Sequence, residues 1–220
     1  MKIKNALWGA ILLMAACHQP GPGITPGKDI TLNSKKVTVT LKDSIAVVTL
    51  YLPKRYDTTF SWIHYSDCGR VCEKQKYRFQ PKTLPIIKET GYFYDRPKDS
   101  VDQFTIVHNP YISPKDRDNP NNKKFMYQFH DHKKWDVIHD PYLKTISSDT
   151  VEKIGDRYFS IIVIDTYDSA HKIYTKRVLS STTLRSSTID FDFELLTKNK
   201  DSVTTHFISD AKAYLRTIRF

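Results

Sequence analysis

Apolar and polar residues alternate along most of this chain, and this period of two restricts its fold more than any other feature. Between residues 36 and 52, two such stretches flank the turn-forming sequence Lys-Asp-Ser, and the first places Val37, Val39 and Leu41 on one face. Successive side chains of a strand point to opposite faces, so alternation is typical of strands with one buried face. Residues 36–52 are therefore predicted to form a β-hairpin.

The same pattern recurs further along the chain in segments rich in β-branched and aromatic residues, as half-buried sheets require. In the last of these segments Phe191 and Phe193 are predicted to point inward, while Asp190, Asp192 and Glu194 point outward. Residues 75–81 and 83–89 are expected to be short and extended. The predicted strands are residues 58–65, 103–109, 124–130, 134–140, 157–165, 172–184 and 187–197.

The C-terminal segment has a helical period instead. Its apolar residues recur at offsets of 0, 4, 7, 8 and 11, which places them on one side of a helix; they are Phe207, Ala211, Tyr214, Leu215 and Ile218. The predicted fold class is therefore α+β, a mainly antiparallel sheet with a C-terminal helix packed on it. An all-β sandwich or barrel is the alternative. Over about the last 60 residues the pattern vaguely resembles the PsbP/Mog1-like α+β fold, a likeness that implies no function.

Residues 109–124 interrupt the sheet pattern with three prolines and four asparagines. Loops of this length inside compact domains are often lids or binding loops. A disordered insertion is the alternative interpretation.

The N-terminus is predicted to be a cleaved export signal. Lys2 and Lys4 precede an apolar stretch from Ala6 to Met14 and two small residues, which is the layout of a secretory signal. The stretch is shorter than the roughly 20 apolar residues that a bilayer span needs. Residues 1–16 are accordingly assigned to the signal.

The sequence Met-Ala-Ala-Cys at residues 14–17 resembles the lipobox of bacterial lipoproteins. The resemblance implies that Cys17 is acylated and becomes the first residue of the mature chain. It also implies a cell-envelope location, with His18 after the cysteine favouring the outer membrane, facing the periplasm. Residues 17–35 are rich in Pro and Gly and are predicted to be a tether, followed by a single domain over residues 36–220.

The predicted export affects which partners the positive net charge of the chain indicates. Without its signal the chain keeps 32 basic and 24 acidic residues, about +8. A basic cytoplasmic protein suggests nucleic acid as a partner, but an exported one does not, so no nucleic acid is expected. The charge is either a solvated surface or an attraction to anionic lipid headgroups or acidic glycans.

Cys68 and Cys72 are predicted to form a disulfide, since an even pair in an oxidising compartment is usually bridged. Asp67 and Gly69 favour the tight turn that such a bridge needs. Two alternatives stay open, a redox dithiol and a zinc site that also uses His64.

Glycine is too sparse for several catalytic motifs. Only Gly69, Gly91 and Gly155 lie in the predicted domain, so neither a phosphate-binding loop, a dinucleotide fingerprint nor a nucleophile elbow can be assembled. No cofactor is expected.

Histidines supply the strongest candidate for metal chemistry. If residues 124–130 and 134–140 form strands, His130 and His132 share a face, and His139 with Asp136 or Asp140 completes the ligands on the next strand. The alternative is an exposed, polar hairpin tip.

Two weaker candidates remain. Asp165, Asp168 and His171 cluster around a predicted turn, where they serve either acid–base chemistry or ordinary turn formation. The 13 Tyr and 11 Phe residues either line a sugar or lipid groove or form core and cross-strand pairs.

The sequence therefore favours a lipid-anchored envelope protein, with a non-enzymatic binding or structural domain for an envelope protein or glycan. A metal-dependent hydrolase using His130, His132 and His139 is one alternative. A periplasmic carrier of a hydrophobic ligand is the other.

Overall fold

A computed structural model describes residues 33–65, 67–69, 72–89, 100–110, 123–140, 145–185 and 187–220. The predicted signal, Cys17 and nearly all of the tether lie outside these residues. Most of the predicted loop at 109–124 lies outside them too. Among the described residues, no helix is both long and apolar enough to cross a membrane.

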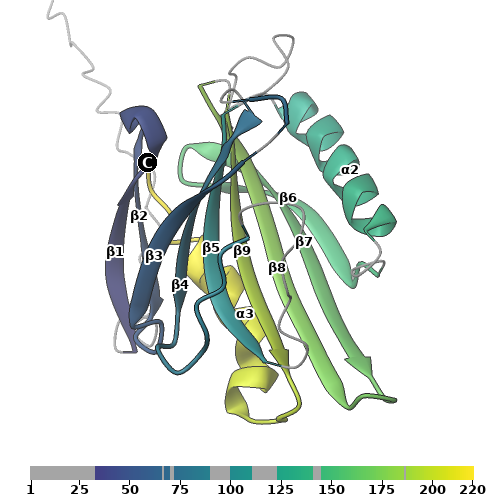
Figure 1. Ribbon diagram of the computed structural model, residues 1–220. Helices are drawn as coiled ribbons and strands as arrows, with labels where there is room; N and C mark the ends of the chain where they lie inside the picture. Colours follow the sequence, from purple (N-terminus) through teal and green to yellow (C-terminus); the bar gives the residue numbers. More distant parts are fainter. Residues whose placement is uncertain are drawn as a thin grey trace, which may run out of the picture.

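The protein is an α+β fold built on a mainly antiparallel sheet, as the sequence predicts (Figure 1). A two-stranded hairpin is formed by β1 (Ser34–Thr40) and β2 (Val47–Pro53), which confirms the hairpin predicted for residues 36–52. Seven further strands form one open sheet in the order β3-β4-β5-β9-β8-β7-β6. Their bounds are β3 (Thr58–His64), β4 (Lys74–Gln80), β5 (Val101–Asn109), β6 (Ser148–Ile154), β7 (Arg157–Asp168), β8 (Ile173–Leu184) and β9 (Ser187–Thr197).

The predicted C-terminal helix is α3 (Ser202–Leu215), which packs on β8, β9 and β2. Asp201 caps its N-terminus by accepting a hydrogen bond from the Thr204 amide at 2.8 Å. All five residues of the predicted apolar stripe are buried. Beyond the helix, Arg219 pairs with Thr49 of β2 and joins the chain end to the hairpin.

The main hydrophobic core lies between one face of the sheet, α3 and the β1–β2 hairpin. We call this the inner face of the sheet. Phe193 of β9 pairs across the sheet with Phe104 of β5 and Val178 of β8, so all three side chains point into this core. The inward orientation predicted for Phe191 and Phe193 is confirmed, because both are fully buried.

One helix was predicted as strands. The predicted strands at residues 124–130 and 134–140 are instead a single helix, α2 (Lys123–His139), which packs on β7 and β6. Its buried residues Met126, His130 and Val137 are spaced by four and seven residues, which is a helical spacing. Because His130 is polar and several aromatic residues lie on the other sides of α2, the helical period is hidden in the hydrophobic pattern.

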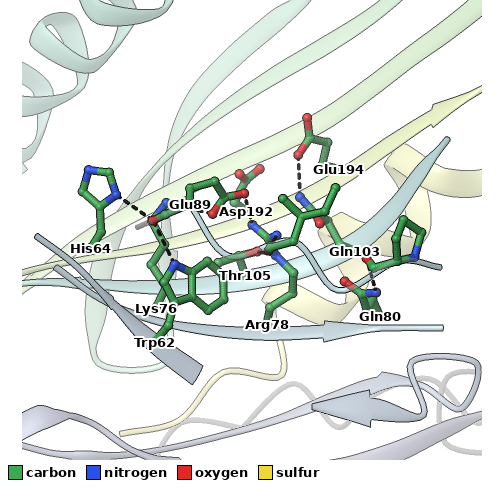
Figure 2. Close-up of polar contacts among 12 residues, drawn as sticks. Trp62, His64, Lys76, Arg78, Gln80, Glu89, Gln103, Thr105, Asp192 and Glu194 are labelled. Atoms are coloured by element: carbon green, nitrogen blue, oxygen red, sulfur yellow. Dashed lines mark hydrogen bonds and ion pairs between the residues drawn. The ribbon is translucent and has the colours of Figure 1, made fainter. Parts of the chain in front are cut away.

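Two further details differ from the prediction. Strand β6 was not predicted, since its sequence Ser-Asp-Thr-Val-Glu-Lys-Ile is polar and half-exposed at the sheet edge. Residues 83–89 form no strand. They cross over the sheet face opposite to the core, which we call the outer face (Figure 2).

Candidate functional site

The outer face of the sheet carries charged residues instead of an apolar layer. Along β9, Asp190, Asp192 and Glu194 alternate with the buried phenylalanines and project from this face, as predicted. α2 covers the outer face at β7 and β6, whereas α3 covers the inner face (Figure 1). The candidate site lies where α2 meets this charged surface.

A bidentate ion pair links β8 and β9. The Arg177 guanidinium donates to Asp192 at 2.8 Å through Nε and at 2.6 Å through Nη2, and both side chains are largely buried. Burial by itself lowers the pKa of Arg177, but Asp192 and Glu194 outweigh it, so the net pKa shift is upward. Arg177 therefore stays charged at any physiological pH.

Asp190 binds α2 to the sheet through hydrogen bonds. One carboxylate oxygen accepts from Lys133 Nζ of α2 at 3.0 Å and from the Ser181 hydroxyl at 2.6 Å. The other oxygen accepts from the Asn109 amide at 2.8 Å. Burial raises the pKa of Asp190, but Lys133, Ser181 and Asn109 together hold it below its usual value.

A cavity of about 240 Å³ lies between α2 and this part of the outer face. Its charged lining combines two cations with four carboxylates: Lys133, Arg177, Asp136, Asp140, Asp190 and Asp192. Apolar patches come from Val107, Val137, Ile162 and Leu179, and hydroxyl groups come from serines that include Ser160 and Ser181. A small, mixed lining of this kind suits a compact polar ligand better than a lipid chain.

His130 joins three elements beside the cavity. Its Nδ1 lies 2.7 Å from the Ser160 hydroxyl of β7, and its Nε2 lies 2.9 Å from Asp149 of β6. The hydrogen bond from His130 and a second one from Lys134 lower the pKa of Asp149. This serine, histidine and carboxylate set attaches α2 to the sheet and also has the members of a hydrolytic triad.

No family model matches the chain, and no curated protein matches it either. The function therefore has to be argued from the chemistry of this site.

The three predicted metal-ligating histidines do not meet. His130 faces the sheet, whereas His132 and His139 are exposed on α2, on either side of the Trp135 ring. In the part of the chain that the structure describes, no group of three or more His, Cys, Asp or Glu side chains is placed to hold a metal ion. The histidine spacing was interpreted on strands, and a helix sends these side chains in different directions.

A second polar cluster lies on the outer face over β3 and β4 (Figure 2). Glu89 receives Arg78 Nη2 at 2.8 Å and Lys76 Nζ at 3.2 Å, while its backbone carbonyl contacts the Trp62 indole at 3.0 Å and His64 Nδ1 at 2.8 Å. The Arg78 guanidinium also lies 4.8 Å from the Trp62 ring. These groups bind one another and fix residues 83–89 to the sheet, so we assign the cluster to structure.

The remaining predicted sites are structural as well. Cys68 and Cys72 form the predicted disulfide, with 5.8 Å between their Cα atoms. At the β7–β8 turn, Asp168 accepts hydrogen bonds from the Ala170 and His171 amides and from the His171 ring. Asp165 binds Lys176 on the adjacent strand. This is ordinary turn and cross-strand chemistry.

Most residues of the site could not be identified from the sequence pattern. Its outward carboxylates on β9 were found from the alternation, but their partners Lys133 and Arg177 were not. Arg177 could have been identified as their partner, because it lies in a predicted strand next to one that exposes three acidic residues. Lys133 could not have been identified, since it lies 57 residues from Asp190 in the chain and meets it only because α2 is a helix.

Proposed function

We propose that the protein is a lipid-anchored envelope protein whose domain binds a small polar ligand in the cavity beneath α2. The cavity is the observation that carries this proposal, because it combines a partly open, concave volume with charges of both signs. The buried ion pairs hold those charges in place before any ligand arrives, which lowers the ordering cost of binding.

The size and lining of the cavity favour an amino acid or a monosaccharide over larger molecules. Pockets for drug-sized ligands measure roughly 300–1,000 Å³, and this cavity is smaller, at about 240 Å³. Four carboxylates, Lys133 and Arg177 disfavour a hydrophobic ligand, because burying these charges against apolar groups is costly. The separation of the three histidines gives no support to a metal-dependent hydrolase.

The lipid anchor at Cys17 is the second part of the proposal. It is supported by the lipobox resemblance and by the signal-like segment before it. The disulfide between Cys68 and Cys72 fits an oxidising compartment such as the periplasm.

Calorimetric titration with N-acetylglucosamine and with D-alanine tests the binding site. We expect one of these envelope components to bind the native chain, and Asp136→Lys to abolish that binding by adding a cation to the lining. Asp131→Lys is the matched control, since Asp131 is also exposed on α2 but does not line the cavity. Equal binding by both variants would refute the site.

A second candidate function follows from the contacts of His130 with Ser160 and Asp149. Ser160 lines the cavity, so a substrate placed there would meet a hydroxyl next to an imidazole base. Against this, Ser160 pairs with Val151 on β6 and with Ser181 on β8. Its neighbouring amides therefore belong to strand ladders rather than to an oxyanion hole.

A fluorophosphonate probe distinguishes the two functions. A binding module leaves Ser160 unlabelled, whereas a serine hydrolase forms an adduct on Ser160 that disappears in His130→Ala. Mass spectrometry of the digested protein locates any adduct.

A further inference from the structure

The solvent-facing side of α2 exposes more large apolar surface than any other element in the described part of the chain. Tyr127 is 46% exposed, Trp135 57% and Ile138 50%. The spacings of eight and three residues place them within about a quarter turn of the helix. Trp135 lies nearly opposite to the buried Met126 and Val137, whereas Tyr127 and Ile138 flank that buried side. We call these three side chains the outer stripe of α2.

Two histidine rings contact Trp135, which lies between Tyr127 and Ile138 along the helix. The His139 ring stacks on it with 4.1 Å between ring centres, and the His132 ring lies nearly parallel at 6.4 Å. An exposed indole fixed in this way pays little additional ordering cost when it is buried against a partner.

We propose that the outer stripe of α2 rests on an anionic lipid surface. Trp and Tyr rings favour the boundary between headgroups and acyl chains, where one edge stays polar and the rest is apolar. The first turn of α2 adds the exposed cations Lys123 and Lys124, and Lys123 Nζ lies 5.8 Å from the centre of the Tyr127 ring. Aromatic rings next to cations are the side chains that favour the boundary of an anionic membrane.

Charge favours a membrane over a second copy of the chain. Without its predicted signal the chain keeps 32 basic and 24 acidic residues, about +8, so two copies would repel each other, whereas anionic headgroups attract the chain. The proposal rests on the anchor at Cys17 for proximity. The 18 residues from Cys17 to Ser34 span at most about 60 Å when extended.

Vesicle binding by a mature chain that carries Cys17→Ser, and so has no lipid, tests the stripe separately from the anchor. Of the two tryptophans in that chain, Trp62 is buried and only Trp135 is exposed. We expect its fluorescence to shift to shorter wavelength with vesicles of phosphatidylglycerol, and much less with phosphatidylcholine. Co-sedimentation should show about tenfold weaker binding for Trp135→Ala, because an apolar side chain no longer enters the interface.

Tyr65→Ala is the matched control, since Tyr65 is 60% exposed and follows β3, the far edge of the sheet from α2. It should bind vesicles as the parent chain does, and far-UV circular dichroism should show that both variants fold. Equal binding by Trp135→Ala and the parent would overturn the proposal, as would no binding to anionic vesicles. A dimer that Trp135→Ala dissociates, without vesicle binding, would assign the stripe to a second copy. None of these results bears on ligand binding in the cavity or on acylation.

Discussion

At the scale of single residues, the outer face depends on charges that are paired and partly shielded from solvent. Arg177 with Asp192 and Lys133 with Asp190 fix the cavity lining, and each pair joins two elements. The alternation in β9 was enough to predict that Asp190 and Asp192 leave the core. It could not predict their partners, because pairing depends on strand order and on the position of α2.

Removing one member of the Arg177–Asp192 pair should be more damaging than removing both. We expect Arg177→Met to lower the free energy of unfolding by about 3–5 kcal/mol, because it leaves a buried carboxylate without its cation. Arg177→Met combined with Asp192→Leu should recover most of that loss. Urea denaturation measures both effects, and a double variant as unstable as the single one would contradict this account.

His108 should make stability depend on pH. It is buried on β5, and among the described residues neither ring nitrogen has a hydrogen-bond partner. Burial lowers its pKa, an effect that Asp43 opposes and Lys42 reinforces. The unfolded chain therefore takes up a proton below about pH 6.5 that the folded chain resists, so stability falls as the pH drops.

The His108→Leu variant isolates this effect. Between pH 7 and 5, we expect the native free energy of unfolding to fall more steeply than that of the variant, by at most about 1.4 kcal/mol per pH unit. Urea denaturation at several pH values measures the difference. Parallel pH profiles would show that His108 does not contribute.

At the scale of elements, α2 shows where sequence patterns failed. Helix α3 and strands such as β9 were predicted because their apolar periods match their buried faces, whereas β7 and β8 were predicted from their β-branched and aromatic residues. In α2 the apolar residues lie on both sides, and the side facing the sheet includes His130 and Lys133. A helix attached partly by hydrogen bonds gives no clear hydrophobic period.

Because His130 attaches α2 to the sheet, we expect its removal to destabilise α2 locally without affecting α3. His130→Ala should speed amide hydrogen exchange along α2, because it removes the contacts with Ser160 and Asp149, while α3 keeps its native protection. His132→Ala, on the exposed side of the same helix, should leave exchange unchanged. Equal effects of the two variants would show that His130 does not fasten the helix.

At the scale of the whole molecule, the inner face of the sheet stabilises the fold and the outer face is available for function. The core under α3 could be predicted in outline because buried residues of strands and helices recur in the sequence with a regular period. The cavity could not, because it depends on segments that are distant in the chain and meet only after the sheet has formed. The anchor is proposed from the first 17 residues alone, independently of the fold.

Native mass spectrometry of the protein released from its own membranes tests the central claim most directly. We predict a chain that begins at an acylated Cys17 and carries a small noncovalent ligand, which is absent from Asp136→Lys and retained by Asp131→Lys. A chain with a bare Cys17 thiol or with residues 1–16 still attached, and with no bound molecule, would contradict the account.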